Sequence, residues 1–408
     1  MKQLTIFTLS LSLLCACTKS EQPQTSATPI SLQPQTRAVL EQTNAFAFDF
    51  FKAVSQQRPT NLFLSPYSVS GVLGMLYNGA AGETKEEIAN VLGMSDFTPT
   101  QVNEYYQELT KALLKVDPKT TLSLANAIWA NQGITLKNAF ITLNQNYYDA
   151  KVGTLDFSQS SALKTINDWC KEKSKGTIPK ILDQIDPLTV VVLANAIYFK
   201  SFWKDKFEKS KTVEKPFHSF DGALSTVPRM HHDPLTLLYA QMDVCGMVTL
   251  PYSNGAFAMN LILPDEGVDL DAFINDLDGA VWNTMIAHRE QAIVTLSMPR
   301  FKIESELDKL KDILAALGMP RAFSPCADFS AMLDIPAYVS KVIQKSYISV
   351  DEAGTEAAAV TVAEMRKGSL GPLPNPKAVT MVLDRPFLFV ITEQSTGAIL
   401  FMGKVTKL

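Results

Sequence analysis

The sequence lacks every short motif that marks a common catalytic site. It contains no G-x-S-x-G nucleophile elbow, no H-E-x-x-H zinc motif, no phosphate-binding P-loop and no G-x-G-x-x-G dinucleotide loop. Histidine is scarce, with 4 residues in 408. The adjacent pair His231 and His232 would face opposite sides of a strand and could not readily bind one metal ion. We therefore expect a protein that is not an enzyme, with no metal site and no cofactor.

Runs of basic residues are also missing. No stretch of Lys and Arg exceeds two residues, and the formal net charge is −4, so we expect no nucleic-acid partner. Beyond the N-terminal segment the cysteines are Cys170, Cys245 and Cys326. An odd number of widely spaced thiols predicts no disulfide framework. We expect these three to be buried free thiols.

The N-terminal segment is typical of an export signal. Lys2 precedes an apolar stretch, 4–14, that is too short to span a bilayer. The following Leu-Cys-Ala-Cys at 14–17 resembles a bacterial lipobox, which implies that residues 1–16 are a lipoprotein signal peptide and that Cys17 is acylated. A plain secretory signal with incidental cysteines is the alternative.

Residues 17–36 are rich in Ser, Thr, Pro and Gln, which predicts a flexible lipid tether. We expect an exported protein whose membrane contact is a lipid anchor at Cys17. The anchor would hold it at the bacterial outer membrane, facing either the periplasm or the cell surface.

Helical patterns dominate the first half of the sequence and strand-like runs the second. Ser65 followed by Pro66 starts a helix that continues to Leu76, because serine caps the first turn and proline fits its first position. Other predicted helices are 40–54, 83–92, 162–173 and 307–317, and predicted strands are 61–64, 122–129, 190–199, 247–250, 259–263, 293–298, 347–350, 387–392 and 399–405. Segregated helices and long antiparallel strands indicate the α+β class.

Six segments, in this order along the chain, resemble signature regions of the serpin family. They are "NLFLSPYSVSGVLGMLYNGAAGETKEEI" (61–88), "INDWCKEKSKGTIPKIL" (166–182), "VLANAIYFKSFWKDKF" (192–207), "LPYSNGAFAMNLILP" (250–264), "DEAGTEAAAVTVAEMRKGS" (351–369) and "DRPFLFVITEQSTGAILFMGKV" (384–405). The resemblance implies a serpin domain at 37–408, with helices packed on a large mixed β-sheet, smaller sheets and an exposed reactive-centre loop at about 352–384. Together with the lipobox it implies a lipoprotein serpin of a Gram-negative bacterium.

In the serpin family a protease cleaves the exposed loop as though it were a substrate. An inhibitory member then inserts the cleaved loop as a new strand of its main sheet and carries the acylated protease along. The resemblance assigns the hinge of this loop to Glu352, Gly354, Thr355, Glu356, Ala357, Ala358 and Ala359.

The side chains of the hinge suit such an insertion. Alternate positions from Thr355 onward (357, 359, 361 and 363) are small or modest and uncharged, whereas the opposite set carries Glu356 and Glu364. That alternation is typical of a half-buried strand. Propensity alone allows a surface helix capped by Thr355, but the β-branched residues at 360–362 favour a strand.

The resemblance also assigns a sheet-opening cluster. Ser65, Ser68 and Asn195 match polar residues beneath the point at which the sheet opens, and Trp203 matches a tryptophan at the top of that opening. Gln344 stands where the family commonly has histidine. Because a glutamine amide can both donate and accept hydrogen bonds, we expect the cluster to persist without the pH sensitivity of a histidine.

Several bonds of the loop remain candidates for cleavage. Family spacing places the scissile residue at Gly368, followed by Ser369, but glycine offers a specificity pocket no side chain. Arg366 and Lys367 suit the acidic pocket of trypsin-like proteases, and Met365 suits an apolar pocket. We expect cleavage at Lys367–Gly368 first, with Arg366–Lys367 and Gly368–Ser369 as alternatives.

The sequence therefore predicts an inhibitory serpin that traps serine proteases of trypsin-like or broad specificity, with cysteine proteases as a wider target class. We expect a monomer. The alternative is a non-inhibitory serpin that acts as a binding or scaffold module. Such a loop would tend to carry bulky or charged hinge residues, which this hinge lacks.

Overall fold

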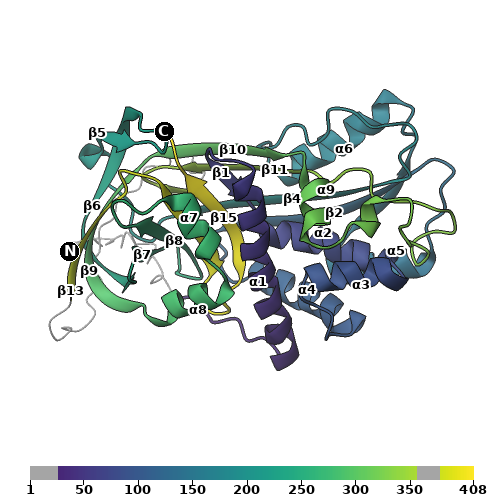
Figure 1. The fold of residues 1–408 in the computed structure, drawn as a ribbon, viewed down its shortest axis with the longest axis horizontal. Helices are drawn as coiled ribbons and strands as arrows, with labels where there is room; N and C mark the ends of the chain where they lie inside the picture. Colours follow the sequence, from purple (N-terminus) through teal and green to yellow (C-terminus); the bar gives the residue numbers. More distant parts are fainter. Residues whose placement is uncertain (1–25, 356–376) are drawn as a thin grey trace, which may run out of the picture.

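The computed structural model describes residues 26–355 and 377–408 (Figure 1). Within these ranges the helices are α1 (Pro34–Gln56), α2 (Pro66–Gly79), α3 (Gly82–Val91), α4 (Pro99–Leu113), α5 (Asn138–Tyr148), α6 (Ser160–Lys173), α7 (Leu270–Asp276), α8 (Gly279–Ala287) and α9 (Leu310–Leu317), with short 3-10 helices η1 (Lys209–Lys211) and η2 (Arg321–Phe323). The strands are β1 (Leu62–Leu64), β2 (Thr121–Asn131), β3 (Lys151–Leu155), β4 (Val191–Phe202), β5 (Val213–His218), β6 (Leu224–Gln241), β7 (Cys245–Pro251), β8 (Phe257–Pro264), β9 (Glu290–Pro299), β10 (Phe301–Leu307), β11 (Gln344–Val350), β12 (Gly354–Thr355), β13 (Lys377–Val382), β14 (Phe387–Glu393) and β15 (Ile399–Val405).

The strands form two sheets. A nine-stranded sheet has the order β1-β15-β14-β8-β7-β6-β9-β13, with β5 paired to β6, and a six-stranded sheet has the order β10-β11-β12-β4-β2-β3. Each sheet contains one parallel ladder, β13 with β9 and β3 with β2, beside antiparallel ones. Helix α2 contacts both sheets, and α6 lies against β2 and β4 (Figure 1). The predicted α+β fold, with helices packed on a large mixed sheet and a smaller sheet, is confirmed.

Two hydrophobic clusters hold these layers together. The larger cluster combines side chains of both sheets with those of α1, α2 and α4, and it includes Phe50, Leu73 and Phe389, which are fully buried. Each such side chain contributes roughly 1.5–3 kcal/mol relative to an exposed one. The smaller cluster lies between α6 and the six-stranded sheet and includes Trp129 and Ile166. The six-stranded sheet is therefore covered on both faces.

Helix starts follow the local capping chemistry. Ser65 caps α2, since its hydroxyl accepts a hydrogen bond from the Ser68 amide, and Pro66 occupies the first turn. Helix α4, which we did not predict, begins with a reciprocal capping box between Thr98 and Gln101. Both helices therefore begin at residues that satisfy otherwise unpaired backbone amides.

Residues 26–36 are not the free tether that the composition predicts. The Ala27 amide donates to the Asn254 carbonyl at 3.2 Å, and the Ile30 amide donates to Ser395 Oγ at 2.9 Å. Helix α1 has already begun within this range. The predicted boundary at residue 36 is therefore too late, because backbone hydrogen bonds tie the chain to the folded domain from Ala27 onward.

Two of the three remaining thiols match the expectation. Cys170 and Cys245 are buried, and burial raises their thiol pKa values to about 12 and about 11. Cys326 is exposed, which corrects the prediction of a third buried thiol. In the described part of the chain, no helix has the length and apolar character needed to cross a membrane.

Candidate functional site at the hinge end of the six-stranded sheet

The candidate site is the interruption between β4 and β11. Over the described residues no ladder joins these strands directly; the two-residue strand β12 lies between them at one end. Thr355 is opposite Val350 of β11 and Ser201 of β4, and both pairings are antiparallel. We call this the hinge end, and we call the space between β4 and β11 beyond Thr355 the gap.

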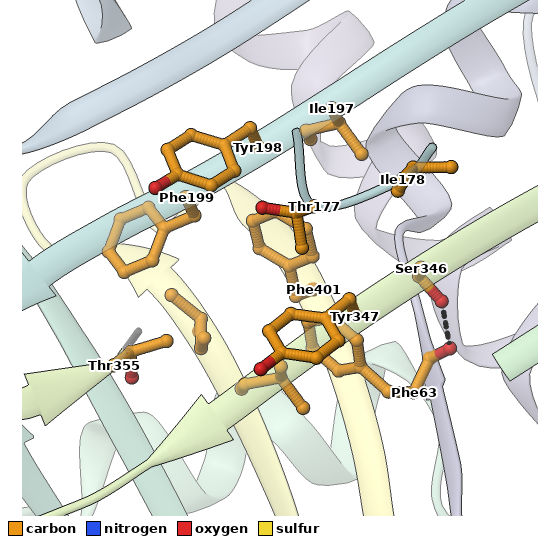
Figure 2. A pocket seen from close by; sticks show the side chains of 12 residues that line it. Phe63, Thr177, Ile178, Ile197, Tyr198, Phe199, Ser346, Tyr347, Thr355 and Phe401 are labelled. Carbon is orange, nitrogen blue, oxygen red and sulfur yellow. Dashed lines mark hydrogen bonds between the residues drawn. The ribbon is translucent and has the colours of Figure 1, made fainter. Parts of the chain in front are cut away.

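Side chains of several elements line the gap (Figure 2). The cavity that remains measures about 10 Å³, room for at most one water molecule. Its lining comes from β4, β11, β12, the α6–β4 connection and the nine-stranded sheet: Ile197, Tyr198, Phe199, Ser346, Tyr347, Ile348, Thr355, Thr177, Ile178, Phe63, Ile391 and Phe401. The two strands thus face each other across packed side chains at the position where a further strand would fit.

Glu352 anchors the chain at the hinge end. Its carboxylate is 3 % exposed and accepts hydrogen bonds from Arg300 Nε at 2.7 Å and from Thr212 Oγ1 at 2.5 Å, while its carbonyl accepts from the Phe207 amide at 3.0 Å. Burial alone would raise the pKa of this carboxyl, but the hydrogen bonds from Arg300 and Thr212 outweigh it and hold the pKa below its usual value. Glu352 is therefore a buried anion held by a partly exposed cation.

This anchor should weaken in acid. Because the pKa of Glu352 is depressed in the folded state, its stabilisation is present above the glutamate pKa of the unfolded chain, about 4.3, and is lost as pH falls through the lower folded value. We expect hydrogen exchange of residues 350–355, corrected for the intrinsic pH dependence, to accelerate below about pH 4.

Glu352→Gln should exchange quickly at neutral pH and lose that acid dependence. The matched control is Glu304→Gln, since Glu304 forms an ion pair with Lys302 whose two side chains are 68 % and 57 % exposed. If Glu352→Gln kept the acid dependence of the unmodified protein, another titrating group would control the hinge.

Trp203, which follows β4, and Tyr252 hold the hinge through hydrogen bonds. Trp203 donates through Nε1 to the Asp351 carbonyl and through its amide to the Ala353 carbonyl, both at 2.9 Å. Its ring stacks on that of Tyr252 at 4.5 Å between centroids, and the Tyr252 hydroxyl shares a 2.5 Å hydrogen bond with Thr355 Oγ1. Burial raises the pKa of Tyr252 far above its usual value, so the hydroxyl stays neutral. Trp203 therefore holds the residues just before β12, and Tyr252 holds Thr355 within it.

Gly354 is required by close backbone packing. A Cβ at this position would lie 2.7 Å from Phe202 Cα and would collide with the Ser201 carbonyl oxygen. Its φ of +154° is also one that residues with side chains rarely adopt. The chain therefore enters between β4 and β11 at the residue that needs the least space.

The sheet-opening cluster lies further along the gap, on the α2 face of the sheet. The Gln344 amide accepts from the Ser65 amide at 3.1 Å and donates to the Ser65 carbonyl at 2.9 Å. Ser68 donates to Asn195, which donates to Asn126 at 2.7 Å. Ser65 is therefore paired with Gln344 of β11, and Ser68 is paired with Asn195 of β4. The hydrogen bond that caps α2, from the Ser68 amide to Ser65 Oγ, joins the two pairs. The role of this cluster in sheet opening stays a prediction.

The structure brings together only part of the predicted loop. Glu352 lies just before β12, and Gly354 and Thr355 lie in it, whereas the remaining predicted hinge residues and all the predicted cleavage residues lie outside the described ranges, as does Cys17. Those loop residues are Glu356, Ala357, Ala358, Ala359, Met365, Arg366, Lys367, Gly368 and Ser369. The predicted loop end at residue 384 is too late, because Lys377–Val382 already forms β13 in parallel register with β9.

The sequence did not identify three partners of the hinge. Arg300 directly precedes β10, Thr212 directly precedes β5 and Tyr252 directly follows β7. They are 52, 140 and 103 residues away along the chain from the hinge residues that they contact. Only tertiary pairing brings them there. No group of His, Cys, Asp and Glu within residues 26–355 and 377–408 could hold a metal ion.

The comparison with family models identifies the fold that this site belongs to. The model described as "Serpin (serine protease inhibitor)" matches residues 41–408. The chain is a serpin. Serpins inhibit proteases and are not themselves enzymes.

Individual relatives support the assignment over nearly the whole chain. The human leukocyte elastase inhibitor is 34 % identical over 374 residues, covering 88 % of this chain and 96 % of that protein. An uncharacterized serpin-like protein of Thermococcus kodakarensis is 32 % identical over 374 residues, covering 91 % of this chain and 86 % of that protein. The native state of the thermophilic serpin Tengpin matches with a TM-score of 0.83 and 32 % identity, covering 94 % of this chain and 97 % of that one. This serpin therefore has relatives in animals and in archaea.

Proposed function

We propose that this serpin traps serine proteases by cleavage of its reactive loop and insertion of the loop between β4 and β11. The observation that carries the proposal is β12, a strand of two residues that pairs with both neighbours at the hinge end. Beyond it the same two neighbours have no ladder between them in the described residues. The gap therefore provides a path for a longer strand.

The register of β12 defines which residues that strand would contain. Gly354 is opposite Phe202 and Thr355 is opposite Ser201, so each further loop residue pairs one position earlier along β4. Continued to Val191, the first residue of β4, this register accommodates residues 356–365. Ala357 and Ala359 then lie on the inner face together with Thr355. This is the face of the predicted strand that carries no charged side chain.

The same register leads to the sheet-opening cluster. Thr361 would be level with Asn195 on β4 and with Gln344 on β11. A threonine hydroxyl can both donate hydrogen bonds to these two amide side chains and accept hydrogen bonds from them. Near Val191 a second apolar cavity, of about 40 Å³, is lined by residues on both sides of the path, including Val190, Leu193 and Val339.

Backbone pairing alone cannot drive the trap. About ten new hydrogen bonds at ~0.5–1.5 kcal/mol each nearly cancel the ~1–2 kcal/mol per residue needed to order the same backbone. Distortion of a captured protease must oppose a stability of ~5–15 kcal/mol. The difference must come from strain in the uncleaved protein, which we propose is stored where β4 and β11 share no ladder.

We further propose that acylated Cys17 anchors the protein at the bacterial outer membrane. Ala27 is the first described residue with a hydrogen bond to the domain and lies ten positions after Cys17, and that length of chain spans at most about 35 Å. The trap would therefore operate close to the membrane, on proteases in the periplasm or at the cell surface.

The direct test is a short incubation with trypsin and, separately, with an elastase. We expect a denaturant-resistant complex near the summed masses on a gel, formed with trypsin in preference because of Arg366 and Lys367. Mass spectrometry of the released C-terminal peptide identifies the cleaved bond from its first residue, which we expect to be Gly368.

The contrary result would be clean cleavage with no complex and full residual protease activity. The protein would then be a substrate for proteases, and the non-inhibitory binding module would be the better description.

A further inference from the structure

The segment that connects α6 to β4 crosses the gap. Residues 177–190 have no regular secondary structure. Figure 2 shows Thr177 between Tyr198 of β4 and Tyr347 of β11, with Ile178 beside it, and both residues line the remaining cavity. A strand that enters the gap must therefore meet this segment.

One side chain fixes the segment in place. Asn167 of α6 accepts hydrogen bonds through Oδ1 from the Ile181 and Leu182 amides, at 2.8 and 2.9 Å. Its Nδ2 donates to the Leu182 carbonyl at 2.9 Å. A single amide thus satisfies three backbone groups of a segment that has no ladder of its own.

The segment also ties the two sides of the gap together. Ile178, Ile181 and Leu182 are buried in the smaller hydrophobic cluster, together with Ala194 of β4. Ile343, which directly precedes β11, packs against the same cluster. Contacts on the outer face of the sheet therefore span from β4 to the start of β11.

Insertion cannot leave these contacts unchanged. The cavity between β4 and β11 holds only about 10 Å³, which is far less than the side chains of a strand occupy. An entering strand must therefore displace Thr177 and Ile178, which line this cavity, and the segment that carries them must shift.

We propose that Asn167 is a positioning residue for loop insertion: its amide holds residues 177–182 over the gap, and release of its three hydrogen bonds controls how fast a strand enters. The proposal rests on the proposed function, because it concerns the same gap and the same inserting strand. Asn167 contacts neither the loop nor the protease, so it acts through the segment that it holds.

The chain offers a closely matched control. Asn61 accepts through Oδ1 from the consecutive amides of Thr406 and Lys407, at 2.7 and 3.0 Å, and donates through Nδ2 to the Lys407 carbonyl at 2.7 Å. Asn61 Oδ1 also accepts from Thr406 Oγ1 at 3.3 Å. The three bonds to backbone groups match those of Asn167, but the segment that Asn61 holds does not line the gap. Asn61→Leu therefore removes the same three backbone bonds as Asn167→Leu, at a different place.

The experiment measures how fast a fluorescent peptide that copies residues 355–365 enters the uncleaved protein. We expect both Leu variants to lower the melting temperature by similar amounts, and only Asn167→Leu to speed peptide entry, by about tenfold. Asn167→Asp keeps both acceptor bonds and loses the donor, so its rate should lie between those of Asn167→Leu and the unmodified protein.

Equal entry rates in the two Leu variants, or an Asn167→Leu rate equal to that of the unmodified protein, would overturn the role of Asn167 while leaving insertion intact. Failure of the unmodified protein to accept the peptide, together with no gain in heat stability on loop cleavage, would overturn insertion itself and the positioning role with it. The two failures are therefore distinguishable.

Discussion

Replacing Ala359 with arginine should convert the protein from an inhibitor into a substrate. The register of β12 places position 359 on the inner face, opposite Ile197 of β4 and Ser346 of β11. Ile197 and Ser346 are both buried, so an arginine there enters the core without a counterion at a cost of several kcal/mol. Since each ~1.4 kcal/mol is a factor of ten in rate, insertion should slow at least about a hundredfold.

A protease on this variant would complete hydrolysis before the loop could carry it away. The measurement is the yield of denaturant-resistant complex and the number of inhibitor molecules consumed per protease inactivated. Glu356→Arg is the control, because position 356 would face Lys200 and Ser349, which are half-buried and leave the guanidinium access to water. Undiminished trapping by Ala359→Arg would show that the loop does not insert in this register.

Cleavage of the loop should raise the melting temperature by at least about 10 °C. Unfolding entropy is about 2.1 cal/mol/K per residue, so for a domain of this size a 10 °C shift corresponds to about 8 kcal/mol. That amount lies within the ~5–15 kcal/mol needed to oppose the stability of a protease domain. A smaller gain would leave the trap too weak to distort its target.

Thermal unfolding of intact and loop-cleaved protein, followed by circular dichroism, measures this gain. Cleavage elsewhere in the chain would lower stability, so mass spectrometry must first locate the cut within residues 356–376. A cleaved protein that melts no higher than the intact one would exclude a metastable native state.

Long uninterrupted patterns in the sequence predicted elements well. The apolar run at 399–405 is β15 with the same two ends, and Ser65 followed by Pro66 begins α2 as expected. The predicted helix at 307–317 begins three residues late, at Leu310, because Leu307 pairs with Gln344 as the last residue of β10. At these residues, pairing of β10 with β11 outweighed the helical pattern of the local sequence.

Interrupted patterns were missed. Strand β6 runs for 18 residues through Pro228, Pro234 and the two adjacent histidines, with a shift of register between His232 and Leu235. Proline and an irregular alternation both argue against a strand in isolation. Pairing with β9 on one side and with β5 and β7 on the other stabilises it nonetheless.

The hinge residues were predictable and their partners were not. Gly354 and the small, uncharged side chains at alternate positions after it can be recognised in the sequence, because strand insertion requires these residue types locally. The Arg300–Glu352 pair and the Trp203–Tyr252 stack depend on how two sheets meet. No spacing rule connects residues that are brought together only by the finished fold.

Strand β15 lies between β1 and β14 in the nine-stranded sheet, although it contains almost the last residues of the chain. Leu62 of β1 pairs with Lys404 of β15. A strand near the start of the chain can therefore pair only after a strand near its end has been made. During synthesis this sheet cannot close until β15 has been made. Until then β1 has no partner strand in this sheet, so the part of the chain made first depends on the part made last for its pairing.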